Sequence, residues 1–196
     1  SVSPYLNAAA TPLAAVLDDI DGQPRDAATP DIGADEYSSV ASPLAGVYTV
    51  GAGGNYATLQ AAANDLAALG VSAPVSMLIL NGTYTASTWF TSIPGTSATN
   101  RVRITSQSGI ASNVVLQANA ANSTGTDAVL HLDGIQYVSF DSVTFAPLEA
   151  TATGAGLVWL QNSPTNDRFL GCVFSVNNGN RSGIRSASLA VVDGLE

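Results

Sequence analysis

The clearest periodic pattern in the chain lies at residues 58–69. Apolar residues recur there at intervals of three and four, which is the spacing of one face of an α-helix. They are Leu59, Ala62, Ala63, Leu66 and Leu69. Thr58 stands before them as an N-cap and Gly70 after them as a stop signal. The pattern predicts one helix of about 58–69 that packs on a core by one face.

After Pro74 the chain changes to short apolar runs separated by Asn, Gly, Ser and Thr. Such runs, rich in β-branched residues, are typical of β-strands. The predicted strands are 75–80, 87–90, 102–105, 114–117, 128–132, 137–140, 143–145, 157–160 and 169–174, with one more at 47–50 before the helix. A single helix followed only by strands predicts an all-β domain.

Two parts of the strand region resemble each other, which indicates an internal repeat. The first runs from Val129 to Phe145 and the second from Val158 to Phe174. Each copy has the order strand, turn with Gly or Asn, strand, turn, strand. A unit of this kind buries its apolar face by stacking on its neighbours, so each copy predicts one rung of a parallel β-solenoid.

Residues 18–37, the acidic segment, follow neither pattern. Seven of the fifteen carboxylates fall within nineteen positions there, interrupted by two prolines and two glycines. This composition excludes an amphipathic helix or a central strand and predicts a turn-rich segment. Because a polar stretch follows, we predict a first domain at 1–37, a linker at 38–46 and a second domain at 47–196.

Composition excludes several classes of protein. With 46% hydrophobic and 11% charged residues, the chain is too apolar to be disordered. Its longest apolar runs are shorter than the roughly 20 residues of a membrane span, so we expect no membrane insertion. The net charge of −9 and the absence of lysine argue against binding to nucleic acid.

The second domain carries a family resemblance in its first half. Residues 47–50, 55–62 and 75–84 are similar to the opening of right-handed parallel β-helix proteins of the pectate-lyase-like superfamily. Residues 93–104 resemble the version found in large secreted bacterial surface proteins, including those exported by type IX secretion. The resemblance implies a right-handed parallel β-helix whose open end is capped by the predicted helix.

The acidic segment resembles a motif that closes β-helix domains in the same proteins. The matching residues are Asp21-Gly22-Gln23-Pro24-Arg25 and Asp31-Ile32-Gly33-Ala34-Asp35-Glu36. The resemblance implies that 1–37 is the C-terminal end of a preceding β-helix module. Residues 47–196 would then be the cap and first rungs of a second module, and we expect the sequence to continue beyond Glu196.

Candidate catalytic groups are few. A Cys/His pair or a Ser/His/Asp arrangement would need the single histidine, His131, and Cys172 lies in an apolar run. We expect packing roles for both, with His131 and Asp133 projecting to the same side of a strand. An enzyme of this architecture would be a polysaccharide lyase or hydrolase with acids set along one face. The candidates Asp127, Asp133, Asp141 and Asp167 with Arg168 form no convincing pair by spacing, and Trp89 and Trp159 are the only tryptophans for sugar stacking.

Calcium is the one ligand for which the residues offer a donor set. The hard oxygen ligands that Ca²⁺ prefers are concentrated in the acidic segment. The candidates are Asp18, Asp19, Asp21, Asp31, Asp35 and Glu36. The spacing does not fit an EF-hand, and Arg25 can neutralise one carboxylate, so a hydrogen-bonded turn cluster is the alternative.

The sequence therefore favours a structural or adhesive repeat module of a large secreted or cell-surface bacterial protein, in a stalk or filament. Its partners would be neighbouring β-helix modules or copies of itself. A polysaccharide-binding or polysaccharide-degrading β-helix protein is the alternative, with extracellular glycans as partners.

Overall fold

The computed structural model describes residues 10–20, 22, 24–33, 42–118, 128–148, 156–176 and 182–186. The chain divides into two compact units, Ser1–Ser42 and Pro43–Glu196. All helices and strands of the described residues belong to the second unit. Its first strand begins at Leu44, within the stretch 38–46 that the sequence suggested as a linker.

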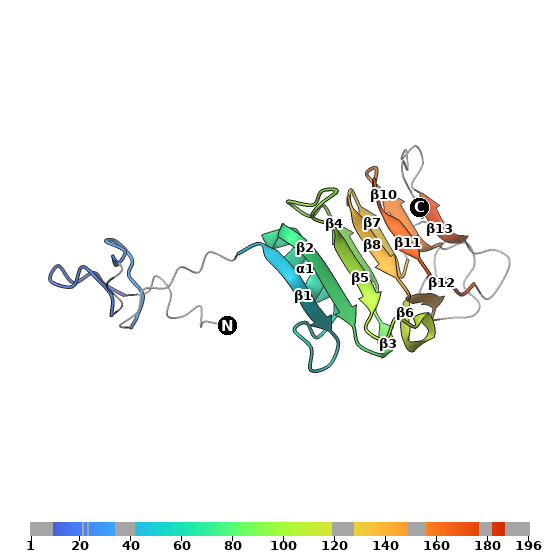
Figure 1. The fold of residues 1–196 in the computed structure, drawn as a ribbon, viewed down its shortest axis with the longest axis horizontal. Helices are drawn as coiled ribbons and strands as arrows, with labels where there is room; N and C mark the ends of the chain where they lie inside the picture. Colours follow the sequence, from blue (N-terminus) through green and yellow to red (C-terminus); the bar gives the residue numbers. More distant parts are fainter. Residues whose placement is uncertain are drawn as a thin grey trace. The chain divides into compact units, whose positions relative to one another are not determined.

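The second unit is a parallel β-solenoid (Figure 1). Sheet 1 contains β1, β2, β5, β8 and β11, sheet 2 contains β3, β6, β9 and β12, and sheet 3 contains β4, β7, β10 and β13. The strands are β1 (Leu44–Val50), β2 (Val71–Ile79), β3 (Gly82–Thr85), β4 (Thr88–Thr91), β5 (Val102–Ser106), β6 (Val114–Ala118), β7 (Leu130–Asp133), β8 (Val138–Asp141), β9 (Thr144–Pro147), β10 (Gly156–Gln161), β11 (Arg168–Leu170), β12 (Val173–Phe174) and β13 (Ser182–Ser186). From β2 onward, every three consecutive strands make one coil with one strand in each sheet, so β2 to β13 form four coils.

The strand register confirms the internal repeat. Leu130 of the second coil pairs with Val158 of the third. Phe140 of the third coil pairs with Phe169 of the fourth. The partners of the first pair are 28 residues apart and those of the second 29, so the two similar segments stack on one another with a shift of one residue between their strands. One repeat therefore has the length of one coil. It begins with the sheet 3 strand of one coil and ends with the sheet 2 strand of the next coil.

The core consists of inward-facing residues stacked from coil to coil. In sheet 1, Met77, Ile104 and Phe140 are in register and fully buried, and Phe169 continues the column in the fourth coil. Phe140 and Phe169 stack with ring centroids 5.3 Å apart, and Phe145 and Phe174 of sheet 2 stack at 5.2 Å. Phe169 and Phe174 are half-buried, so the aromatic side chains of the fourth coil are less covered than those of the third.

The helix α1 (Leu59–Leu69) contacts β1, β2 and β4 at the start of the solenoid. Thr58 accepts a hydrogen bond from the Ala61 N–H at 3.1 Å, and Gly70 ends the helix with a φ of 68°. Four of the five residues of the predicted apolar face are buried, and Leu69 is half-buried. The predicted helix, its caps and its packing face are confirmed.

Several strands differ from the sequence prediction. Residues 82–85 form β3, which is not among the strands predicted from the sequence. The run 169–174 is divided into β11 and β12 by a turn at Gly171, whose φ of 59° is left-handed. The strand β13 and the short 3₁₀ helix η1 (Ala111–Asn113) were not predicted.

The first unit consists of turns in its described residues. The Ala10 N–H donates to the Pro30 carbonyl at 2.8 Å, and the Arg25 N–H donates to the Leu17 carbonyl at 2.8 Å. Asp18 and Pro24 form an isolated antiparallel bridge. This confirms the turn-rich prediction for the described part of the acidic segment.

Within the described residues, no helix combines the length and the apolar character needed to cross a membrane.

Candidate functional sites

The predicted calcium ligands lie partly within the described residues. Asp18, Asp19 and Asp31 are described, with Asp31 only 2% exposed. Asp21, Asp35 and Glu36 lie outside the described residues. In the part of the chain that the structure describes, no three acidic, histidine or cysteine side chains come together as metal ligands. Calcium binding by the full set stays a prediction.

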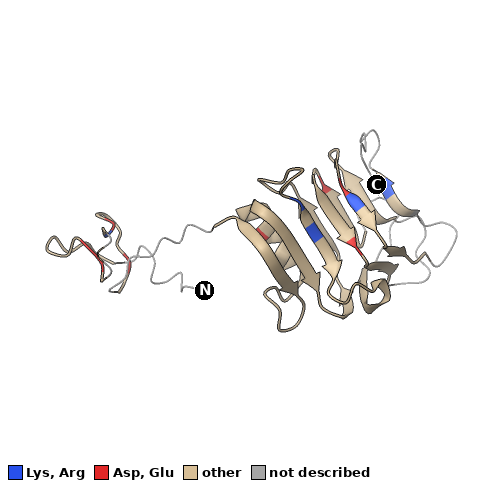
Figure 2. Cartoon of the chain, in the orientation of Figure 1, with Lys and Arg blue, Asp and Glu red and all other residues tan. Residues whose placement is uncertain are grey.

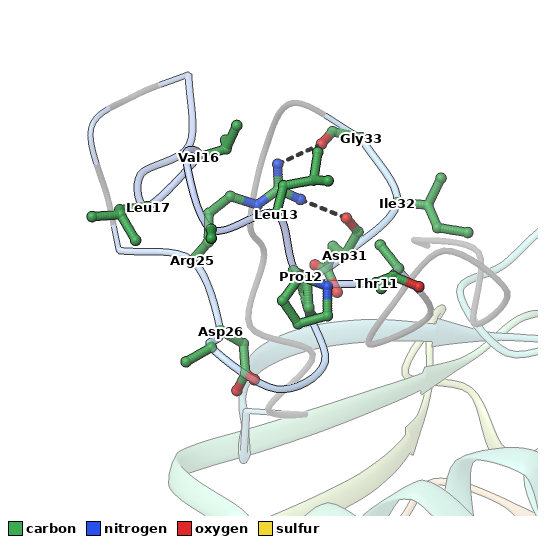
Figure 3. A pocket seen from close by; sticks show the side chains of 14 residues that line it. Thr11, Pro12, Leu13, Val16, Leu17, Arg25, Asp26, Asp31, Ile32 and Gly33 are labelled. Atoms are coloured by element: carbon green, nitrogen blue, oxygen red, sulfur yellow. Dashed lines mark hydrogen bonds between the residues drawn. The ribbon is translucent and has the colours of Figure 1, made fainter.

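The polar groups of this unit take part in turn hydrogen bonds. The Arg25 guanidinium donates to the carbonyl oxygens of Asp31 and Gly33, at 2.6 and 3.0 Å (Figure 3). The Asp26 carboxylate accepts from the N–H groups of Ala28 and Thr29, which lowers its pKa. These bonds are those of a turn cluster held by its own backbone.

A pocket of about 320 Å³ lies beside the Arg25 side chain (Figure 3). Leu13, Leu17 and Ile32 contribute to its lining and are largely exposed. Because the guanidinium nitrogens bond to backbone carbonyls next to the pocket, Arg25 acts there as a clamp on residues 31–33. This clamp gives the arginine of the acidic segment a structural role.

The second candidate site is a row of side chains on the outer face of sheet 3, which we call the tryptophan row. It contains Trp89 of β4, His131 of β7, Trp159 of β10 and Arg185 of β13, which are in register. The rings of Trp89 and His131 stack at 3.9 Å with an interplanar angle of 7°. The Arg185 guanidinium lies 5.6 Å from the centre of the Trp159 ring. Both tryptophans of the chain therefore lie on one face of the solenoid.

The tryptophan row is flanked by polar residues. Thr91, Asp133 and Gln161 are in register beside it, two residues further along their strands. Asp133 accepts a hydrogen bond from the Asn162 amide. Trp89 is 42% exposed, whereas His131 is 1% exposed. The exposed parts of this face thus combine an indole ring with hydroxyl, carboxylate and amide groups.

His131 and Cys172 do not form a catalytic pair. His131 lies on the outer face of sheet 3, where its Nε2 accepts from the Ala128 N–H at 3.3 Å. Cys172 lies in the turn between β11 and β12 and donates to the Phe140 carbonyl at 3.1 Å. Burial raises the pKa of this thiol, which disfavours the nucleophilic thiolate. The packing role expected for each residue agrees with these contacts.

The candidate catalytic acids occupy different parts of the solenoid. Asp133 ends β7 in sheet 3, and Asp141 ends β8 in sheet 1, where it forms an ion pair with Arg103. Asp167 is buried in the turn before β11 and accepts from the Val138 N–H. Arg168 begins β11 opposite Ser139, and Asp127 lies outside the described residues. The described acids therefore bind different partners and are not arranged as an acid pair.

Part of the tryptophan row was accessible from the sequence. At an offset of 28 residues the two copies place Trp159 on His131, as the strand register does, whereas alignment of their first residues, Val129 and Val158, places it on Leu130. More residues separate Trp89 from His131 than separate His131 from Trp159, so Trp89 could not be aligned with His131 from the repeat.

Comparisons with protein-family models, with curated proteins and with solved structures found no match for this chain.

Proposed function

We propose that this chain is a structural or adhesive repeat module of a large secreted or cell-surface bacterial protein. The observation that carries the proposal is the stacking of successive coils in register. Each coil presents nearly the same backbone to the next, so the architecture lengthens by simple repetition. A solenoid of this kind suits a stalk or filament, with neighbouring modules or further copies of the chain as its partners.

The surface chemistry supports the same proposal. The chain has no lysine and a net charge of −9, and charged residues are sparse along the solenoid strands (Figure 2). A rod of stacked coils needs a polar, solvated surface that resists nonspecific association.

The experiment is to locate the native protein on the cells that produce it. Antibodies raised against residues 43–196 would be used for immunogold electron microscopy of intact cells. We expect the gold to decorate extended rods or fibres at the cell surface, and antibody absorbed with the purified chain to give no labelling. Labelling of the cell interior, or of discrete globular particles, would contradict the proposal.

Glycan binding is the second candidate function, and the tryptophan row favours it. An exposed indole beside hydroxyl, carboxylate and amide groups is a combination that can stack on a sugar and bond to its hydroxyls. Trp89 remains 42% exposed although its ring stacks on His131, so part of the indole is accessible for such a contact.

A panel of acidic and neutral polysaccharides tests this second candidate by affinity electrophoresis. Binding that weakens at least tenfold in Trp89→Ala, and persists in the control Tyr48→Phe on sheet 1, would support a glycan site in the row. Release of reducing sugars or unsaturated products from any polysaccharide would instead favour the degrading enzyme and would overturn the structural proposal.

A further inference from the structure

The coils are joined in two different ways where the chain enters sheet 1. The Val75 N–H donates to the Arg101 carbonyl at 3.0 Å, and the Val102 N–H donates to the Tyr137 carbonyl at 3.1 Å. At the equivalent position of the third coil, where β8 begins, the Val138 N–H donates to Oδ1 of Asp167, at 2.8 Å. A carboxyl group thus takes the place of a peptide carbonyl between the third and fourth coils.

The Asp167 side chain is turned inward at this position. It is 2% exposed, and its second oxygen, Oδ2, is buried without a hydrogen-bond partner. A buried ionised carboxylate with one unsatisfied oxygen is costly, whereas the neutral carboxyl keeps its bond from Val138 without a buried charge. Accordingly, burial raises the pKa of Asp167 to about 7, and the Val138 N–H and the Arg101 charge lower it by less.

The charged groups around Asp167 are Arg101, in the turn before β5, and Arg168, in β11. The Arg101 guanidinium lies 5.3 Å from the centre of the Tyr137 ring and donates to the Asn166 carbonyl at 3.0 Å. Arg101 thereby connects the turn before β5 to the turn before β11. Arg168 follows Asp167 directly and is half-buried.

We propose that Asp167 is a pH-sensitive latch, which holds the fourth coil on the third when its carboxyl is protonated and loosens that coil when it ionises. The latch is a property of the coil junction and does not depend on the proposed function.

The direction of the pH effect follows from the two states of the carboxyl. Its pKa lies above the ordinary value of 3.8 while the coil is closed and returns toward that value when the coil opens. The stabilisation is therefore complete below about pH 4 and is lost as the pH rises to about 7. Within this window, opening of the coil becomes easier by up to about tenfold per pH unit, and above it the effect levels off.

Hydrogen exchange of the Val138 amide measures the opening. After correction for the intrinsic pH dependence of exchange, we expect its protection to fall between pH 4.5 and 7 and to level off above pH 7. In Asp167→Asn the protection of the Val138 amide should no longer change with pH, although it can differ from the wild-type protection by a constant factor. The control Asp133→Asn removes a half-exposed carboxylate of the same solenoid and should retain the wild-type slope.

The carboxyl itself is followed by carbon NMR of the wild-type protein, which keeps the test valid if a variant fails to fold. We expect the Asp167 carboxyl to titrate with a midpoint near 7, and Arg101→Gln to move the midpoint upward. A midpoint near the ordinary 3.8, or an Asp167→Asn protein with the wild-type slope, would overturn the proposal.

Discussion

At the scale of single residues, Thr58 has a direct and testable role. Its hydroxyl accepts from the Ala61 N–H and satisfies one of the free donors in the first turn of α1. We expect Thr58→Ala to lower the free energy of unfolding by about 1 kcal/mol in urea denaturation. Thr58→Ser keeps the hydroxyl and should stay close to the wild type. Equal losses in the two variants would show that the cap is not the source of the stability.

Gly95 is required for a different reason, the close approach of two backbone segments. Its φ is +84°, and a Cβ there would overlap the carbonyl oxygen of Val71. Gly109 has a similar φ of +69°, but a Cβ there meets nothing within 4 Å. Alanine at Gly109 should therefore cost only the left-handed backbone penalty of about 1–2 kcal/mol. Gly95→Ala should cost clearly more, as measured by urea denaturation, and equal costs would contradict the close approach.

The roles of individual polar residues were the hardest to predict. The alternation of the strand places His131 and Trp159 on an outer face, because side chains alternate along a strand. Nothing in the sequence shows that Asp167 turns inward to bond the Val138 N–H, because this depends on the backbone of a turn and on its neighbours in the adjacent coil. The periodicity of a strand indicates on which face of the sheet a side chain lies. A turn has no such periodicity, so the direction of its side chains cannot be predicted in this way.

At the scale of elements, the long periodic features were predictable and the short ones were not. The helix has a cap, an apolar face and a glycine stop that all agree. By contrast, β3 has four residues, and its pairing with β6 in the next coil outweighs the turn preference of Gly82. The two-residue strand β12 is likewise defined by its parallel partner β9. Pairing between coils is non-local, so a local pattern cannot reveal it.

The packing between elements predicts a gradient of stability along the coils. Phe140 is fully buried and its ring packs against Phe90, Phe145 and Phe169. We expect Phe140→Ala to lower the free energy of unfolding by about 3–5 kcal/mol, because it removes a large buried ring and leaves a cavity.

Phe169 provides the matched comparison, since it occupies the same column one coil later and is only half-buried. Phe169→Ala should cost less than Phe140→Ala in the same urea denaturation experiment. Equal costs would mean that the fourth coil is packed as tightly as the third.

At the scale of the whole molecule, the repeat carried more information than any single motif. One repeat corresponds to one turn of the solenoid, and the similarity of its two copies was visible in the sequence before any strand pairing was known. The division into three sheets was not visible, because the number of residues between successive strands differs between the first two coils. The repeat thus indicates the stacking of the coils but not the sheet to which each strand belongs.

Calcium binding by the acidic segment can be tested on the native protein. Two described side chains of the segment bond to the backbone, Arg25 to two carbonyls and Asp26 to two N–H groups. If these turn bonds rather than a cation hold the segment, removal of calcium with EGTA should leave the melting temperature unchanged. A site saturated at 100 times its Kd would instead stabilise the protein by about 2.7 kcal/mol. That would shift the melting temperature by several degrees, at about 2–4 °C per kcal/mol. A shift of this size that disappears in Asp18→Asn would establish the calcium site in place of the turn cluster.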